Sequence, residues 1–144
     1  MIENALFGRT FEVLERSLDV RQIRHGMIAA NLANSETPGY RAVDVEFGQT
    51  MQNIIQRVED SESGMEIFNA DDSAAEKIGG GMNLDDLEIK TDDAELVGRD
   101  SNTVSMENEI AKMQENRMMY GIVAQLLARR FKGLSDAITS GSQG

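Results

Sequence analysis

The sequence has no cysteine, no tryptophan, one histidine and one proline among its 144 residues. Without cysteine, the chain can form neither disulfides nor thiolate metal sites, and it has no thiol nucleophile. His25 has no second histidine or cysteine with which to share a metal, so we interpret it as a solvated side chain at the edge of a helix contact. Aromatic residues are also few, so aliphatic side chains and methionine must build the core.

Long apolar runs are missing as well. No stretch approaches the ~18 apolar residues that a membrane span requires. Residues 1–8 lack the basic start of a cleavable signal peptide, and no sustained apolar centre follows them. We therefore expect any export of this protein to use a route that reads no such signal.

Motifs that carry catalysis or ligand binding are not found either. The triplet Gly79–Gly81 lacks the Gly-Lys-Ser/Thr ending of a phosphate loop. The acidic pairs Asp85-Asp86 and Asp92-Asp93 lack the spacing of a calcium loop, so a solvated acidic face explains them better. No Gly-x-Ser-x-Gly element accompanies the single histidine. We predict that the protein is not an enzyme and holds no metal and no cofactor.

Charge is distributed unevenly along the chain. The formal net charge is −11, and residues 57–100 hold 14 of the 25 acidic residues but only 4 of the 14 basic ones. Both ends of the chain are therefore almost neutral. Nucleic-acid binding needs clustered Lys and Arg and is disfavoured. The pattern favours a solvated middle and two ends that meet other protein surfaces.

The first long helix is predicted from Thr10 to about Ala33, after a short arm of residues 1–9. Thr10 can cap this helix, and Glu12 and Glu15 lie near its positive end. Apolar residues recur at alternating spacings of four and three from Phe7 to Leu32, which is a heptad seam that only Arg21 and His25 interrupt.

A sharp corner is predicted after this helix. Asn34 and Ser35 let the chain leave the helix, because their side chains bond to nearby backbone. Thr37 is pushed towards extended geometry by the proline that follows it. Pro38 and Gly39 fit the two central positions of a type II turn, in which glycine takes a positive φ.

A short strand and a second helix are predicted next. Val43, Val45 and Phe47 alternate with polar residues, which indicates a strand or extended arm. Apolar residues then return at four-three-four spacing, which predicts a helix over about residues 49–59. This apolar series is Phe47, Met51, Ile54 and Val58.

The acidic stretch of residues 60–100 is predicted to consist mostly of loops or mobile chain. Two short strands are possible within it, one over Leu87–Thr91 and another over Glu95–Gly98.

The last long helix is predicted from a cap at Ser105 to about Thr139 and carries a second four-three seam. Residues 118–128 are apolar nearly all round, with Gln125 as their one strongly polar side chain. One partner helix covers only one stripe of such a helix, so apolar surface is left for neighbouring molecules. The alternative is a monomer that buries the same hairpin. The residues expected to form the coiled-coil and assembly seam are Phe11, Leu14, Leu18, Ile28, Leu32, Ile110, Met113, Tyr120, Leu127, Phe131, Leu134 and Ile138.

We therefore predict a mainly α fold. Its long N- and C-terminal helices form a coiled coil, and its middle is short, extended or β, and rich in loops. Three regions follow: residues 1–48 with the first helix, corner and arm; residues 49–100 with the short helix and acidic stretch; and residues 101–144 with the last helix.

The segment from Ala30 to Tyr40 resembles the N-terminal signature of flagellar axial proteins, the family that forms rod, hook and filament. Residues 102–109 resemble the segment that opens the last helix of that family, although Ser105 stands where aspartate is common. Residues 125–134 are similar, more specifically, to the end of a basal body rod protein. The matched signature positions are Ala30, Asn31, Ala33, Asn34, Thr37, Pro38, Gly39 and Tyr40.

This resemblance implies a structural subunit of the proximal rod, stacked helically around an axial export channel. It implies further copies and other rod proteins as partners, with the membrane ring and export gate at the inner end, and no nucleic acid. It also implies a periplasmic location in the basal body after export through the flagellar type III apparatus. Two alternatives are a sister rod protein and a cytoplasmic helical chaperone or adaptor of the export machinery.

Overall fold

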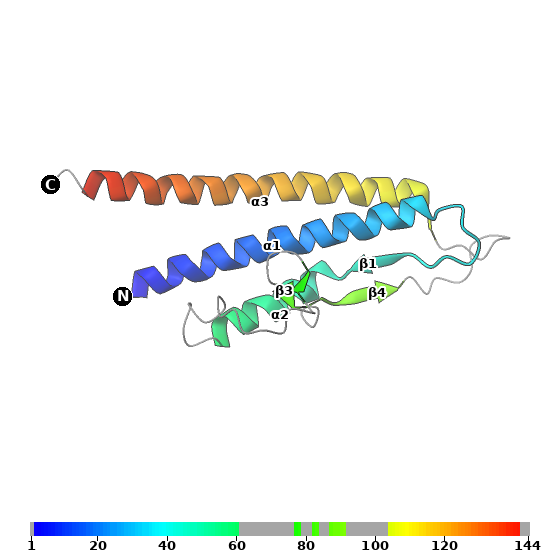
Figure 1. Ribbon diagram of the computed structural model, residues 1–144, viewed down its shortest axis with the longest axis horizontal. Coiled ribbons are helices and arrows are strands. Elements are labelled where there is room, and N and C mark those ends of the chain that lie inside the picture. Colours follow the sequence, from blue (N-terminus) through cyan, green and yellow to red (C-terminus); the bar gives the residue numbers. More distant parts are fainter. Residues whose placement is uncertain (1, 61–76, 79–81, 84–86, 92–103, 142–144) are drawn as a thin grey trace.

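The computed structural model describes residues 2–60, 77–78, 82–83, 87–91 and 104–141 (Figure 1). The fold is mainly helical, as predicted, with a small β part in the middle. In chain order, the elements are α1 (Ile2–Ala33), β1 (Val43–Val45), α2 (Phe47–Asp60), β2 (Lys77–Ile78), β3 (Met82–Asn83), β4 (Ile89–Thr91) and α3 (Met106–Gly141).

The two long helices lie side by side and run in opposite directions (Figure 1). The start of α3 meets the end of α1, where Asn31 bonds to Glu109. Far along α3, the ring of Phe131 contacts that of Phe11, near the start of α1. The predicted pairing of the N- and C-terminal helices within one subunit is therefore confirmed, and it is antiparallel.

The predicted start of the first helix was wrong. Residues 2–9 do not form an arm, because α1 already begins at Ile2 and passes through Thr10 without a cap. These residues contain no proline, and the single glycine, Gly8, weakens a helix without ending it. The predicted end at Ala33 is confirmed. There the side-chain amide of Asn34 donates a hydrogen bond to the carbonyl oxygen of Ala30, 2.9 Å away.

The corner after α1 has the predicted turn geometry. Gly39 has a φ of 73°, the left-handed region that favours glycine. The backbone N–H of Tyr40 donates to the carbonyl oxygen of Thr37 at 3.2 Å, which closes a four-residue turn around Pro38 and Gly39. This corner sends the chain back along α1 as β1.

Strand β1 pairs antiparallel with β4, with Val43 opposite Thr91 and Val45 opposite Ile89. The first was predicted as a strand or extended arm, and the second lies within the possible strand Leu87–Thr91. The predicted helix over residues 49–59 is also confirmed, as the slightly longer α2. The hairpin of β2 and β3 was not predicted. The glycine triplet between these strands, most of the acidic stretch and the predicted strand Glu95–Gly98 lie outside the described residues.

The apolar core lies between α1 and the layer formed by α2, β1 and β4, on the side of α1 away from α3 (Figure 1). The predicted apolar face of α2 contributes to it as expected. The part of α1 that contributes to the core is the face with Val13, Val20 and Met27, which are seven residues apart. Val20 is fully buried, and the predicted seam did not include this face. The buried members are Val20, Val45, Ile54, Val58 and Leu87, and Val13, Ile23, Met27, Phe47 and Met51 pack against them half-buried.

Helix α1 is thus the middle layer of three, with α3 on one side and the apolar core on the other. None of the described helices is long and apolar enough to cross a membrane.

Candidate assembly surface

The side chain of Asn31 joins three elements at the end of α1. Its amide nitrogen donates to the carbonyl oxygen of Val43 and to Oε2 of Glu109, each at 2.8 Å. Its oxygen accepts from the backbone N–H of Val43 at 3.1 Å and from the hydroxyl of Tyr40 at 3.2 Å. Asn31 is fully buried, and these four bonds use its full donor and acceptor capacity. Two polar positions of the signature, Asn31 and Tyr40, therefore tie the subunit together internally.

Charged side chains surround this junction. Arg24 donates two hydrogen bonds to Asp44, at 2.7 and 3.0 Å. Lys112 donates to Glu109 at 2.6 Å and lies 3.7 Å from Asp44. Burial alone would raise the pKa of Asp44, but the hydrogen bonds from Arg24 and the charges of Arg24 and Lys112 outweigh it and hold that pKa below its ordinary value. The junction is thus a paired, charged cluster between α1, β1 and α3.

Of the other signature positions, only Asn34 is half-buried, bonded to the carbonyl oxygen of Ala30. Ala30, Ala33, Thr37, Pro38 and Gly39 are exposed, so they are available to a neighbouring molecule without any change in the fold.

Further along α3, polar contacts to α1 continue. Asn116 is almost fully buried, and its amide donates to the carbonyl oxygen of Arg21 at 2.7 Å. The guanidinium of Arg21 lies over the ring of Phe47, 4.0 Å from its centre. At the other end of the pair, the rings of Phe11 and Phe131 meet edge to face with their centres 4.3 Å apart.

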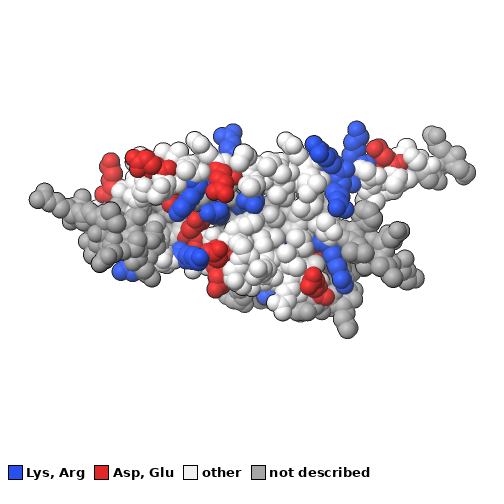
Figure 2. All heavy atoms as spheres, turned by 180° about the vertical axis from the view of Figure 1, so that it is seen from behind, with Lys and Arg blue, Asp and Glu red and all other residues white. Residues whose placement is uncertain are grey.

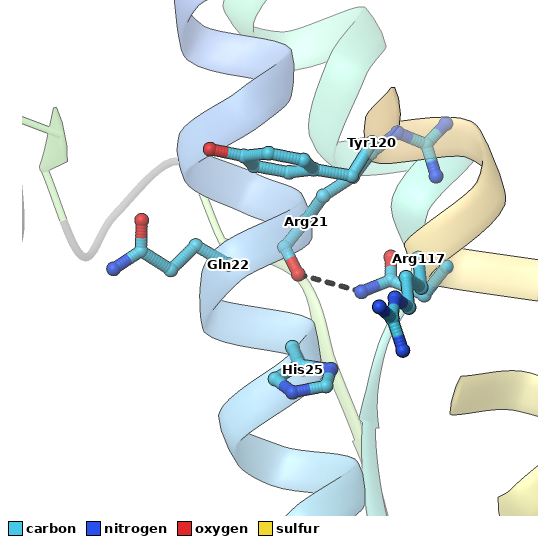
Figure 3. Close-up of a pocket in the computed structure, with 6 residues that line it drawn as sticks. Arg21, Gln22, His25, Arg117 and Tyr120 are labelled. Atoms are coloured by element: carbon cyan, nitrogen blue, oxygen red, sulfur yellow. Dashed lines mark hydrogen bonds between the residues drawn. The ribbon is translucent and has the colours of Figure 1, made fainter. Parts of the chain in front are cut away.

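A cavity of about 290 Å³ lies beside Asn116 (Figure 3). His25 and Arg117 point into the same region in the figure, and His25 is exposed, as the sequence predicted. The lining residues include no carboxylate, so His25 has no carboxylate partner within the cavity. Among the described residues, no group of three or more His, Cys, Asp or Glu could hold a metal ion. The cavity is lined by Arg21, Gln22, His25, Asn116, Arg117 and Tyr120.

The predicted seam is divided by the structure into a covered and an uncovered part. On α1, Ile28 is fully buried and the other four seam residues are half-buried. On α3, Met113 and Leu127 are half-buried, whereas the remaining seam residues are exposed. The half-buried seam residues of α1 are Phe11, Leu14, Leu18 and Leu32. The exposed seam residues of α3 are Ile110, Tyr120, Phe131, Leu134 and Ile138.

The exposure of Ile110 has a clear cause. Glu109 and Asn116, seven residues apart, are buried against α1 because they bond to Asn31 and to the backbone of Arg21. The face of α3 that contacts α1 is therefore shifted by one residue from the predicted seam at this end. Ile110 does not take part in that contact, and 44% of its surface is exposed.

Two apolar stripes on α3 are largely exposed in the part of the chain that the structure describes. The end stripe consists of Phe131, Leu134 and Ile138, exposed by 53%, 57% and 67%. The outer stripe consists of Met118, Ile122 and Leu126, exposed by 60%, 55% and 43%. The outer stripe turns away from α1, because Asn116 and the half-buried Val123 occupy the opposite side of the helix.

An antiparallel pair of long helices with uncovered apolar stripes is typical of a structural subunit that packs against other molecules. No family model matches the chain. It is 27% identical over 128 residues to "Flagellar basal body rod protein FlgB" of Escherichia coli K12, which covers 89% of this chain and 91% of that protein. The protein of the same name from Borrelia hermsii is 25% identical over 137 residues, covering 92% and 98%.

A third protein of that name, from Borreliella burgdorferi, is 23% identical over 133 residues and covers 90% of this chain and 95% of the relative. The chain is thus similar to the FlgB rod proteins over nearly its whole length. This confirms the resemblance seen in the signature and in the last helix.

Proposed function

We propose that this chain is a structural subunit of the flagellar basal body rod, which stacks helically with further copies around the axial export channel. The relationship to FlgB rod proteins supports the rod as its location. The observation that carries the assembly proposal is the end stripe, three large apolar residues that each keep more than half of their surface exposed in the described structure. Neighbouring subunits would bury it, which makes assembly favourable.

In this proposal, the α1–α3 pair is the unit that forms the inner layer of the tube. The exposed signature positions at the corner and the end stripe lie at opposite ends of that unit, so one subunit can contact several others. Other rod proteins continue the stack, and the membrane ring and export gate meet its inner end. In the same proposal, the subunit reaches the periplasm through the flagellar export apparatus.

The test is the Leu134→Asp variant, expressed in cells that lack the wild-type gene. Leu134 is more than half exposed, so the carboxylate is solvated in the free subunit but would be buried without a partner in the rod. We expect a normally folded and exported subunit but no basal bodies in electron micrographs. Ser135→Asp is the matched control, because it adds the same charge next to the stripe and should leave assembly intact.

Two outcomes would overturn the proposal. Normal basal bodies built from Leu134→Asp would show that the end stripe is not an assembly contact. A wild-type subunit that stays in the cytoplasm, bound to other export substrates, would point to a chaperone instead. Labelling the subunit in purified rods gives its position and separates it from a sister rod protein.

A further inference from the structure

The outer stripe is flanked by opposite charges. Glu115 lies three residues before Met118, and Arg129 lies three residues after Leu126, with Ile122 at the centre. The five residues therefore follow spacings of three, four, four and three, which read the same in both directions. All five are exposed and lie on one face of a single continuous helix.

This face is open in the described structure. Helix α3 is an outer layer, with α1 on its other side (Figure 1). Seen from behind, acidic groups with a basic group beside them lie towards one end of the molecule's upper edge, and basic groups gather towards the other end, with an acidic group beyond them (Figure 2). The face thus has an acidic end, an apolar centre and a basic end.

We propose that two free subunits pair through this face, with their α3 helices antiparallel and Ile122 on the two-fold axis. The two-fold symmetry then determines which residues of the two copies meet. Met118 of one copy meets Leu126 of the other, and Glu115 meets Arg129, and each contact occurs twice. A parallel pair would place Glu115 against Glu115 and Arg129 against Arg129, so the charges select the antiparallel arrangement.

The residues one step further out fit the same arrangement. Ala111 and Gly133 are also equally distant from Ile122, and both are exposed and small. Small residues at both ends of the contact let two helices approach closely. Self-complementarity in spacing, charge and size favours a second copy of this chain over an unrelated partner.

This pair forms between free subunits and is not a contact of the proposed rod. Copies stacked helically along a rod share one direction, whereas the paired copies point in opposite directions. The pair therefore covers the outer stripe before assembly and must separate when subunits are added to a rod. Its loss would leave the proposed rod function untouched.

Cross-linking tests the two-fold axis directly, because the chain has no native cysteine. In Ile122→Cys, the two thiols of a pair face each other, and packed helices approach closely enough for a disulfide. We expect a covalent dimer on oxidation of the purified protein at micromolar concentration. Gln52→Cys is the control, since it places an exposed thiol on α2 and should stay monomeric.

Charge reversal tests the direction of the pair by sedimentation equilibrium. Glu115→Arg and Arg129→Glu each create two like-charge contacts, and each should raise the dimer dissociation constant at least about tenfold. The double variant restores both pairs with reversed polarity and should return the constant to within about threefold of the wild type. Circular dichroism checks that each variant keeps its helices.

Three results would overturn the pair: a monomeric wild-type protein at high concentration, Ile122→Cys that cross-links no faster than Gln52→Cys, or single reversals that the double variant does not rescue.

Discussion

Asn31 and Glu109 are 78 positions apart in the sequence, and their side chains meet in a buried hydrogen bond of 2.8 Å. Both are almost or completely inaccessible to solvent. The bond joins the last turn of α1 to the first turn of α3. Since Asn31 also holds both backbone groups of Val43, one side chain fixes the relative positions of both long helices and the strand between them.

We expect Asn31→Asp to destabilise the subunit by roughly 2–4 kcal/mol. The change removes both donors and places a second carboxylate against Glu109, so the carbonyl of Val43 loses its partner and two like charges meet. Urea unfolding of the purified variant measures the effect. Asn108→Asp is the control, because Asn108 is exposed in the first turn of α3, where a negative charge is tolerated. Equal stability of the two variants would contradict the role of Asn31.

Much of the fold could be predicted from the sequence. Period-two alternation predicted β1, and four-three spacing predicted α2 and α3. The proline–glycine pair predicted the corner at Gly39. These signals are local, because each element carries its own pattern. The hairpin of β2 and β3 was missed, since strands of two residues are too short to show a period.

The side chains that unite the elements were harder to predict. Helix α1 packs on two sides, against α3 and against the apolar core. The predicted heptad seam did not include the residues of the core side, so Val20 was missed. Polar residues such as Asn116 read as surface, since their burial depends on a partner almost a hundred residues away. No local pattern contains that information. The signature did identify Asn31, but through family resemblance and without showing its role.

Gly39→Ala should destabilise the subunit by about 1–2 kcal/mol through the backbone alone. A Cβ at this position would meet no atom within 4 Å, but the φ of 73° is unfavourable for alanine. Gly26→Ala is the control, because Gly26 lies inside α1 and a Cβ there would also meet no atom within 4 Å. There alanine should stabilise the protein by about 0.5–1 kcal/mol. Thermal unfolding should therefore shift in opposite directions.

Asp44→Asn should remove an acid-sensitive part of the stability. Since the pKa of Asp44 is lowered in the folded state, its charge stabilises the fold above the ordinary carboxyl pKa of about 4. That contribution is lost as the pH falls through the lowered pKa. At pH 7 the variant should be less stable by roughly 1–3 kcal/mol.

Urea unfolding between pH 7 and pH 2 measures this difference. The pKa values of Glu12 and Asp19 are raised by burial and act in the opposite sense, but they cancel between wild type and variant. A difference that stays constant over the whole range would show that the charge of Asp44 is not the cause.

Leu127→Asp should weaken both folding and assembly. Leu127 is half-buried, so a carboxylate there loses packing and solvation already in the free subunit, by roughly 2–3 kcal/mol. Leu134→Asp, in contrast, should unfold at the wild-type urea concentration. Basal body counts and unfolding midpoints of both variants separate the two effects. Wild-type stability of Leu127→Asp would place this residue outside the α1 contact.

The antiparallel α1–α3 pair also determines when the subunit can fold during its synthesis. Asn116 reaches the backbone of Arg21 across 95 positions, and Phe131 reaches Phe11 from near the end of the chain. A ribosome synthesises α1 before α3, so until α3 has been made α1 can pack only against α2 and the strands. Contacts between such distant segments also form slowly. The subunit therefore cannot reach its folded form before α3 has been made.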